Sequence, residues 1–147
     1  MEKHVPEEHQ KLENQLCFPL YAASRLVTRL YQPLLEQHRL TYPQYIILLI
    51  LWQQDGITVG EIGKQALLNS NTLTPILKRM EQAELVMRQR DEDDERKMLI
   101  FLTDSGRALQ KTLSCLPTQL IAQVDYDAEK ARQLKRLLHD LIQHLAE

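Results

Sequence analysis

The sequence has few of the residues that mark metal-binding, disulfide-stapled or fibrous proteins. Its 147 residues include only 2 cysteines, 4 glycines and 6 prolines. So few glycines and prolines argue against long disordered or fibrous stretches. Cys17 and Cys115 lie far apart, and neither belongs to a CxxC or CxxH pair, so we expect no structural zinc site. The five histidines share no ligand spacing, so we expect no metal site and no cofactor.

Long apolar runs are also missing. The longest, Ile46–Trp52, is too short to cross a membrane and predicts a core helix. The N-terminus, MEKHVPEEHQ, is polar and acidic, unlike a signal peptide. We therefore expect a cytoplasmic protein with no membrane partner and no static disulfide. Taken alone, each cysteine is best interpreted as a small buried hydrophobe.

The net charge of −2 gives no support for nucleic-acid binding by itself. The distribution of charge says more, because basic residues gather in one stretch of the chain. This stretch contains Lys64, Lys78, Arg79, Arg88 and Arg90. A locally basic face on an acidic protein can still bind phosphate.

The first third of the chain has a helical pattern. Apolar residues recur at spacings of three and four, which predicts one face of a long helix; they are Leu12, Leu16, Leu20, Ala23, Val27, Leu30 and Leu34. Pro33 predicts the end of this helix. A second helix is predicted over Tyr42–Gln53, and Gly56 follows as a stop signal.

Two shorter helices are predicted next. Thr58 and Glu61 have the spacing of a capping box at the start of a helix over Val59–Ala66. After a connector over Leu67–Asn71, a helix ending near Glu84 has one apolar face, formed by Leu73, Ile76, Leu77 and Met80. Its other face is polar and basic and carries Thr72, Thr74, Pro75, Lys78, Arg79 and Gln82. Two short helices of this kind form a helix-turn-helix.

A hairpin and more helices complete the pattern. Strands are predicted over Leu85–Arg90 and Lys97–Leu102, joined by the polar loop Asp91–Arg96. A hairpin directly after a recognition helix is a wing. Thr103 and Asp104 predict the start of a helix that runs to Cys115 or beyond and bends or stops near Pro117. The last helix is predicted over Ala128–Ala146.

The fold class predicted from this order is mainly α with a small β-hairpin wing, a winged helix-turn-helix. We expect one domain over 1–147, with the winged region at about 42–102 and dimerisation helices at about 8–38 and 104–147. The flanking helices are too apolar and too long for one 147-residue chain to bury alone. A second copy of the same helices is their expected partner, which makes the protein a homodimer.

The winged region resembles that of MarR-family regulators. The motifs that carry the likeness are Glu84-Leu85-Val86-Met87-Arg88 after the recognition helix, Asp91–Arg96 in the wing, and Leu102-Thr103-Asp104-Ser105-Gly106 at the next helix. Two further stretches, LCFPLYAASRLVTRLYQPLL and LTYPQYIILL, resemble the organic-hydroperoxide-sensing OhrR branch. The likeness implies a MarR-like dimer that represses transcription and is no enzyme.

The resemblance also implies roles for single residues. Cys17 matches the peroxide-sensing cysteine, and Tyr31 and Tyr42 match the tyrosines that hydrogen-bond its thiolate from the other subunit. Arg96 matches an arginine that enters the minor groove, and Asp94 the acid that orients it. The residues implied at palindromic double-stranded operator DNA are Ser70, Thr72, Thr74, Pro75, Lys78, Arg79, Arg88, Asp94 and Arg96.

The chemistry of Cys17 agrees with this role. A thiolate attacks a peroxide, and a helix N-terminus and phenolic hydroxyls favour the charged sulfur. Oxidation to sulfenic acid is reversible. Cys115 precedes Pro117, whereas the resolving cysteine of two-cysteine members aligns near Ala122, so Cys115 is only a possible second redox cysteine. A small thiol is the other candidate partner for oxidised Cys17.

Two other functions stay open at this stage. One is a MarR-type repressor gated by a small phenolic or aromatic ligand. The other is a thiol peroxidase that uses Cys17, although this gives the helix-turn-helix and the wing no role. Catalytic consumption of peroxide would favour the enzyme, and release of DNA by salicylate-like compounds without peroxide would favour the ligand-gated repressor.

Overall fold

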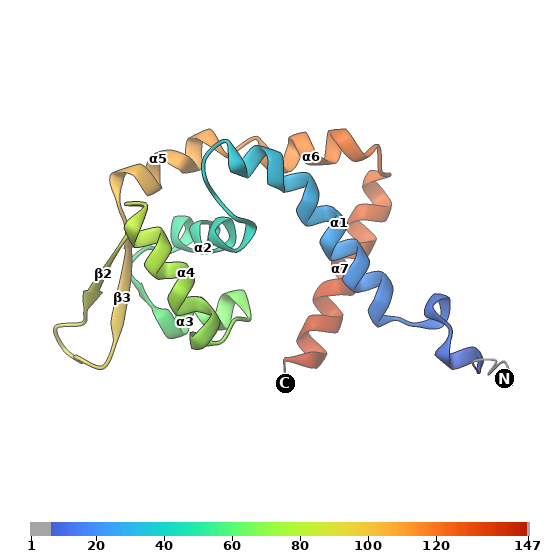
Figure 1. Ribbon diagram of the computed structural model, residues 1–147, viewed down its shortest axis with the longest axis horizontal. Coiled ribbons are helices and arrows are strands. Elements are labelled where there is room, and N and C mark those ends of the chain that lie inside the picture. Colours follow the sequence, from blue (N-terminus) through green and yellow to red (C-terminus); the bar gives the residue numbers. More distant parts are fainter. Residues whose placement is uncertain (1–6, 147) are drawn as a thin grey trace, which may run out of the picture. The chain divides into compact units, whose positions relative to one another are not determined.

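The computed structural model describes residues 7–146 and divides the chain into two compact units, Met1–Leu113 and Ser114–Glu147. The first unit holds two short 3₁₀ helices, five α-helices and a three-stranded sheet (Figure 1). Its elements are η1 (Glu8–Gln10), η2 (Leu12–Asn14), α1 (Cys17–Glu36), α2 (Tyr42–Gln53), β1 (Ile57–Thr58), α3 (Val59–Ala66), α4 (Ser70–Gln82), β2 (Val86–Arg90), β3 (Met98–Leu102) and α5 (Asp104–Thr112). The second unit holds α6 (Leu116–Val124) and α7 (Ala128–Leu145).

The long first helix passes through Pro33, so the prediction that it ends there is wrong. Helix α1 continues for another turn, to Glu36. A proline removes one backbone hydrogen bond from a helix but leaves the following residues free to continue it. Leu35 in that last turn is 1% exposed, and burial of its side chain holds the turn in place.

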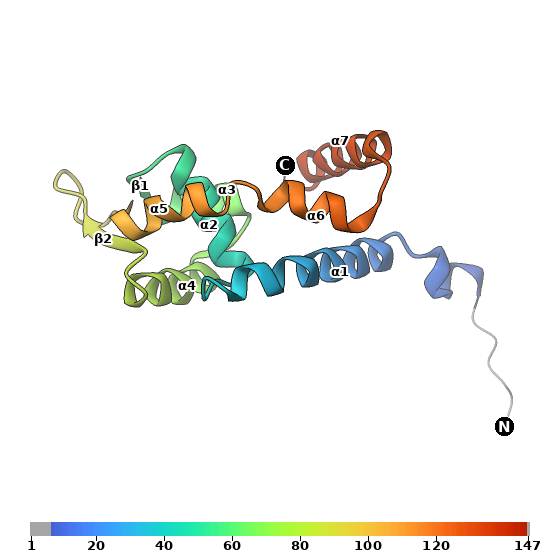
Figure 2. The ribbon, with the colours of Figure 1, turned by 90° about the horizontal axis from the view of Figure 1, so that it is seen from above.

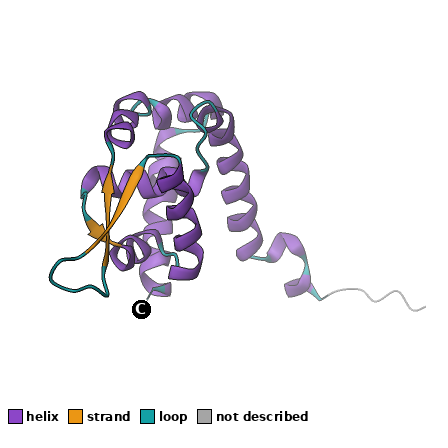
Figure 3. Cartoon of the chain, turned by 60° about the vertical axis from the view of Figure 1, so that its left-hand side comes forward, coloured by secondary structure: helices purple, strands orange, loops and turns teal. Residues whose placement is uncertain are grey.

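The predicted helix-turn-helix and wing are confirmed. Helix α3 begins with the predicted capping box, in which Thr58 and Glu61 each accept from the other's backbone N–H. The connector is shorter than expected, because Asn69 caps α4 through the backbone N–H of Thr72 and the helix begins at Ser70. The outer hairpin, β2 and β3, extends into the wing loop (Figure 3).

The sheet has one strand more than the sequence predicted. Its order is β1-β3-β2, all antiparallel, and β1 pairs Ile57 with Ile100 and Thr58 with Leu99. This strand is only two residues long, too short to show an alternating pattern. It joins the start of α3 to the base of the wing.

One apolar core holds the winged region together. The side chains that are almost fully buried come from α2, α3, α4 and the sheet, and they include Leu48, Ile62, Leu73, Leu77, Met80, Val86 and Ile100. Helix α5 packs on α2 behind this core (Figure 2). There the Trp52 indole N–H donates to the carbonyl of Gly106, at 2.9 Å. The recognition helix α4 and the wing are therefore built on a rigid support.

The helix after the wing ends earlier than the sequence indicated. Thr103 caps α5 as predicted, but α5 stops at Thr112 instead of running to Cys115. Cys115 is the N-cap residue of the separate helix α6, and Pro117 lies in the first turn of that helix. Proline fits a first turn because the N–H groups there have no partner within the helix.

Helix α7 has a marked apolar face and no buried residue. The exposed large apolar side chains on it are Leu134, Leu137, Ile142 and Leu145. Helix α1 also exposes apolar side chains, namely Phe18, Leu26 and Val27. Neither set is covered within its own unit of the described chain. Over residues 7–146, no helix is long and apolar enough to cross a membrane.

Four described residues other than glycine have a positive φ: Arg39, Leu67, Glu84 and Asp125. Glu84, between α4 and β2, has φ +57°, the left-handed region that costs residues other than glycine about 1 kcal/mol. We expect Glu84→Gly to raise the free energy of unfolding by up to about 1 kcal/mol in urea titrations. The neighbouring Ala83 has φ −82°, so Ala83→Gly is a matched control that should lower stability by about 0.5–1 kcal/mol. Changes of the same sign in both variants would contradict this account.

Candidate functional site

The outer face of α4 carries the residues that the sequence analysis assigned to DNA. All six are exposed: Ser70, Thr72, Thr74, Pro75, Lys78 and Arg79. Asn71, which the sequence analysis placed in the connector, is exposed in the same first turn. Leu73, Leu77 and Met80 fix this orientation because they are buried in the core.

The polar groups of this face differ in what they can bind. The Thr74 hydroxyl donates to the carbonyl of Ser70 at 2.8 Å, so outward it can only accept a hydrogen bond. Within residues 7–146, neither Lys78 nor Arg79 forms an ion pair, and both cations are available to phosphate. The face can therefore combine short polar groups near its N-terminus with two cations further along, a pattern suited to a DNA groove.

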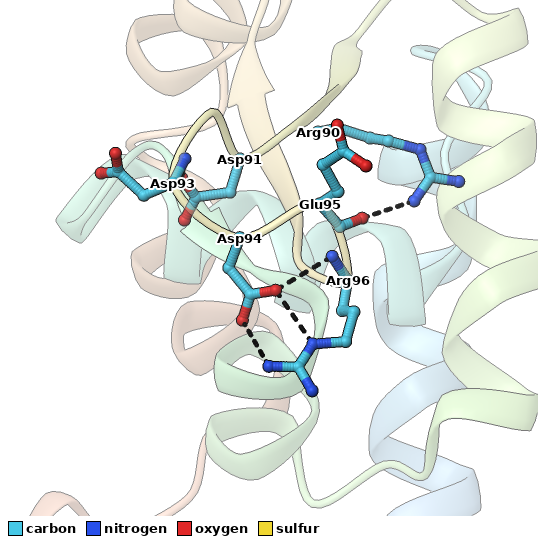
Figure 4. Close-up of polar contacts among 6 residues, drawn as sticks. All are labelled: Arg90, Asp91, Asp93, Asp94, Glu95 and Arg96. Carbon is cyan, nitrogen blue, oxygen red and sulfur yellow. Dashed lines mark hydrogen bonds and ion pairs between the residues drawn. The ribbon is translucent and has the colours of Figure 1, made fainter.

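The wing holds one arginine in a defined direction. The Arg96 side chain is 92% exposed, yet its Nε lies 3.1 Å from Asp94 Oδ1. The same carboxylate oxygen accepts the backbone N–H of Arg96, also at 3.1 Å (Figure 4). Arg90 braces the other side of the loop by donating to the carbonyl of Glu95 at 2.7 Å. Asp94 thus orients Arg96, the contact that the resemblance implied.

The ionisation of Asp94 provides a test of this contact. Hydrogen bonds from the side chain and backbone of Arg96 lower the pKa of Asp94, with a smaller contribution from Lys97. A lowered pKa means that the contact is complete above the ordinary value of about 3.9 and is lost only as the pH falls through the lowered value. We expect carboxyl NMR titration to place the Asp94 midpoint below 3.9. The Arg96→Ala variant should move that midpoint upward, and an unchanged midpoint would show that Arg96 does not hold Asp94 in solution.

Arg88 is arranged differently from the other predicted DNA-binding residues. Its Nε and Nη2 donate to the two carboxylate oxygens of Glu81, at 2.8 and 3.0 Å. This bidentate pair lowers the pKa of Glu81 and ties β2 to α4. The positive charge of Arg88 is thus balanced by an acid on α4, so any phosphate contact by Arg88 is weaker than one by an unpaired arginine.

Cys17 is the first residue of α1 and its side chain is exposed. The preceding residue, Leu16, makes no side-chain cap, so the first N–H groups of the helix are left without a partner. These groups and the helix dipole favour an anion at this end of the helix. The position also exposes the Cys17 thiol to reactants.

Tyr31 and Tyr42 lie in contact, as members of a cluster of three tyrosines. Their ring centroids are 4.9 Å apart, and Tyr45 lies 5.9 Å from Tyr31. Tyr45 was not among the predicted site residues, although it follows Tyr42 by three residues and so shares a face of α2. Burial and the neighbouring phenols raise the pKa values of Tyr31 and Tyr45. Both therefore keep the proton that a hydrogen bond to a thiolate requires.

One chain does not bring Cys17 to these tyrosines. Tyr31 lies fourteen residues after Cys17 on the same helix, a rise of about 21 Å. A contact between the sulfur and the tyrosine cluster therefore requires two copies of the chain. Cys115 is also an exposed free thiol, and it belongs to the second unit.

Comparisons with known proteins decide the family. Residues 29–113 match the family model described as transcriptional regulator SarA/Rot. The chain is 47% identical, over 94% of both chains, to the organic hydroperoxide resistance transcriptional regulator of Bacillus subtilis. This chain belongs to the MarR/SarA family of winged helix-turn-helix regulators. The family assignment confirms the predicted fold class and the prediction of a regulator rather than an enzyme.

Solved structures of MarR/SarA regulators agree with this assignment. Reduced AbfR bound to DNA matches with a TM-score of 0.78 and 38% identity, covering 95% of this chain and 98% of that one. AbfR comes from Staphylococcus epidermidis, and its disulfide-formed structure matches with a TM-score of 0.62 and 39% identity, covering 95% of this chain and 92% of that one.

Within the residues described here, no three His, Cys, Asp or Glu side chains gather in a way that could hold a metal ion.

Proposed function

We propose that the protein is a homodimeric repressor that binds palindromic operator DNA and releases it when an organic hydroperoxide oxidises Cys17. The observation that carries this proposal is the separation of the two halves of the sensor within one chain. Cys17 lies exposed at the start of α1, and the tyrosine cluster lies about 21 Å further along. The two halves meet only across a dimer, which makes the cysteine a reporter on how the subunits are arranged.

The dimer is supported by the apolar side chains that each unit leaves exposed. Burying Leu134, Leu137, Ile142 and Leu145 of α7 and the exposed apolar residues of α1 against a second copy removes a large apolar surface from water. A dimer also presents two recognition helices to two half-sites of one operator. A stable monomer at micromolar concentration in sedimentation velocity would contradict this part of the proposal.

DNA binding is supported by the surface that α4 and the wing present. The exposed polar face of α4 suits a major groove, and the anchored guanidinium of Arg96 suits a narrow minor groove. The relatives point in the same direction, since reduced AbfR was solved bound to DNA.

The chemistry begins at the Cys17 thiolate. It attacks one peroxide oxygen, so that an S–O bond forms while the O–O bond breaks and the alkoxide leaves, taking up a proton to become an alcohol. The product is a sulfenic acid. A small thiol, or Cys115, then forms a disulfide with Cys17 and releases water. Because the oxidised sulfur no longer carries a charge, the hydrogen bonds from Tyr31 and Tyr42 weaken, and a coupling of a few kcal/mol is enough to shift the repressor from bound to free.

A fluorescence-anisotropy titration tests this function. The upstream intergenic DNA is labelled, and the reduced protein is added with and without cumene hydroperoxide. We expect tight binding before oxidation, release afterwards, and rebinding after dithiothreitol unless the sulfur is overoxidised. Release by salicylate without peroxide would support the ligand-gated repressor instead. Continuous consumption of peroxide in excess of the protein, with a thiol present, would support a thiol peroxidase.

A further inference from the structure

A hollow beside the tyrosine cluster is lined by two arginines. Its volume is about 280 Å³, and it lies between the second half of α1 and the start of α2. The residues that line it are Arg25, Thr28, Arg29, Gln32, Leu35, Leu40 and Tyr42. No acidic side chain is among them. The hollow therefore offers positive charge on an apolar floor.

The two guanidinium groups have no acidic partner among residues 7–146. Arg25 lies over the ring of Tyr21, 5.4 Å from its centroid, and Arg29 forms no ion pair with a described residue. They are four residues apart on α1, a spacing at which like charges repel. An anion placed between them relieves that repulsion, so the hollow is suited to a carboxylate.

The segment before Cys17 contains a carboxylate of this kind. Glu7 and Glu8 are used within the segment itself, since Glu7 caps η1 and Glu8 bonds to Lys11 and Asn14. Glu13, in η2, is exposed and forms no hydrogen bond or ion pair with another described residue. It precedes Cys17 by four residues, so the Cα atoms of the two are at most about 13 Å apart.

The proposed function brings this carboxylate toward the hollow of the other subunit. Tyr42 belongs both to the tyrosine cluster and to the wall of the hollow. If Cys17 of the partner subunit meets the cluster, Glu13 of the partner subunit lies within reach of Arg25 and Arg29. Within one chain the described residues do not make this contact, because η2 precedes Cys17 whereas Arg25 and Arg29 lie about 12 and 18 Å beyond Cys17 along α1.

We propose that Glu13 of one subunit is seated between Arg25 and Arg29 of the other. This inference rests on the proposed function, and it assigns all three as positioning residues that hold the partner's Cys17 at Tyr31 and Tyr42. By two-fold symmetry the contact occurs twice in the dimer. It gives the reactive cysteine a fixed place without contacting the sulfur.

Reversing the charges of Glu13, Arg25 and Arg29 tests this contact. All variants carry Cys115→Ser, so that only Cys17 reacts, and the measured quantity is the rate constant for loss of its thiol with cumene hydroperoxide. Glu13→Arg alone, and Arg25→Glu with Arg29→Glu, should each slow this reaction about tenfold, the effect of losing one partly buried ion pair. Combining all three should restore most of the original rate. The rate of alkylation of Cys17 by iodoacetamide at a fixed pH should also change in the first two variants and return to the original value in the combination.

Matched controls separate this contact from a general effect of charge. Arg39 is exposed and does not line the hollow, so Glu13→Arg with Arg39→Glu should stay as slow as Glu13→Arg. A combination no faster than its parts would overturn the inference. Sodium benzoate gives a second test. If benzoate protects Cys17 of the original protein and the combined variant does not recover the original rate, the hollow binds a small free carboxylate, and the inference is also overturned. If Cys17→Ser still abolishes the peroxide response in that case, the proposed function is retained and only the contact of Glu13 with Arg25 and Arg29 is wrong.

Discussion

Gly106→Ala is expected to lower the free energy of unfolding by at least about 3 kcal/mol. A methyl group at this position would lie 2.2 Å from the carbonyl oxygen of Leu85 and 3.1 Å from the side chain of Leu102. The carbonyl of Gly106 also accepts the indole N–H of Trp52, so the backbone cannot shift freely to make room. The close approach of α5 to the start of β2 therefore requires glycine.

Helix propensity alone predicts that Gly106→Ala raises the free energy of unfolding. The sign of the measured change therefore distinguishes the packing effect from propensity. Gly106 lies inside α5, where an alanine normally adds about 1 kcal/mol of stability. Gly60 is the matched control because it lies inside α3 and an added methyl group meets only Thr58 Oγ1, at 3.8 Å. In urea titrations Gly60→Ala should be at least as stable as the original protein. Equal stability of the two alanine variants would show that the packing of α5 in solution differs from that described here.

Arg96→Ala is expected to weaken operator binding by about ten- to a hundredfold at moderate salt. The exposed guanidinium is held by Asp94 in one direction, so its loss removes both a charge and a pre-oriented contact. The slope of log K against log[salt] should fall by about one unit, because one fewer counterion is released.

A control variant distinguishes this contact from a change in net charge. Arg132 on α7 is exposed, pairs with Glu129 and is not among the predicted DNA-binding residues, so Arg132→Ala removes the same charge from a different element. It should leave the affinity and the salt slope nearly unchanged. Asp94→Asn should have an intermediate effect, because Arg96 remains but loses its anchor. An unchanged affinity for Arg96→Ala would remove the wing arginine from the DNA interface.

Local chemistry explains why much of the winged region could be predicted from the sequence. The capping box of Thr58 and Glu61 depends on two residues three apart, and the cap at Thr103 is equally local. The spacing of Leu73, Leu77 and Met80 sets which face of α4 is buried, and the polar face follows from it. Such features need no knowledge of distant parts of the chain.

The features that were missed depend on distant residues. Strand β1 exists because Ile57 pairs with Ile100, and its two residues carry no pattern of their own. The turn after Pro33 persists because Leu35 is buried by other elements. The hollow with Arg25 and Arg29 forms only where α1 meets α2, so no short motif signals it.

The redox residues were found by resemblance, and physical reasoning alone would have missed them. An isolated cysteine is ordinarily a small buried side chain, whereas Cys17 is exposed. The structure then adds the distance between these residues, which their sequence motifs do not give. Because Cys17 and Tyr31 lie fourteen residues apart on the same helix, about 21 Å along its axis, a sensor built from them needs two subunits.

The most direct test of the account compares two serine variants on a labelled operator. Cys17→Ser and Cys115→Ser are titrated with cumene hydroperoxide in the presence of a small thiol, and the fraction of bound DNA is followed by anisotropy. We expect Cys17→Ser to bind the operator as the original protein does and to keep it at every peroxide concentration, while Cys115→Ser releases it. Release of DNA by Cys17→Ser on peroxide treatment would contradict the central claim.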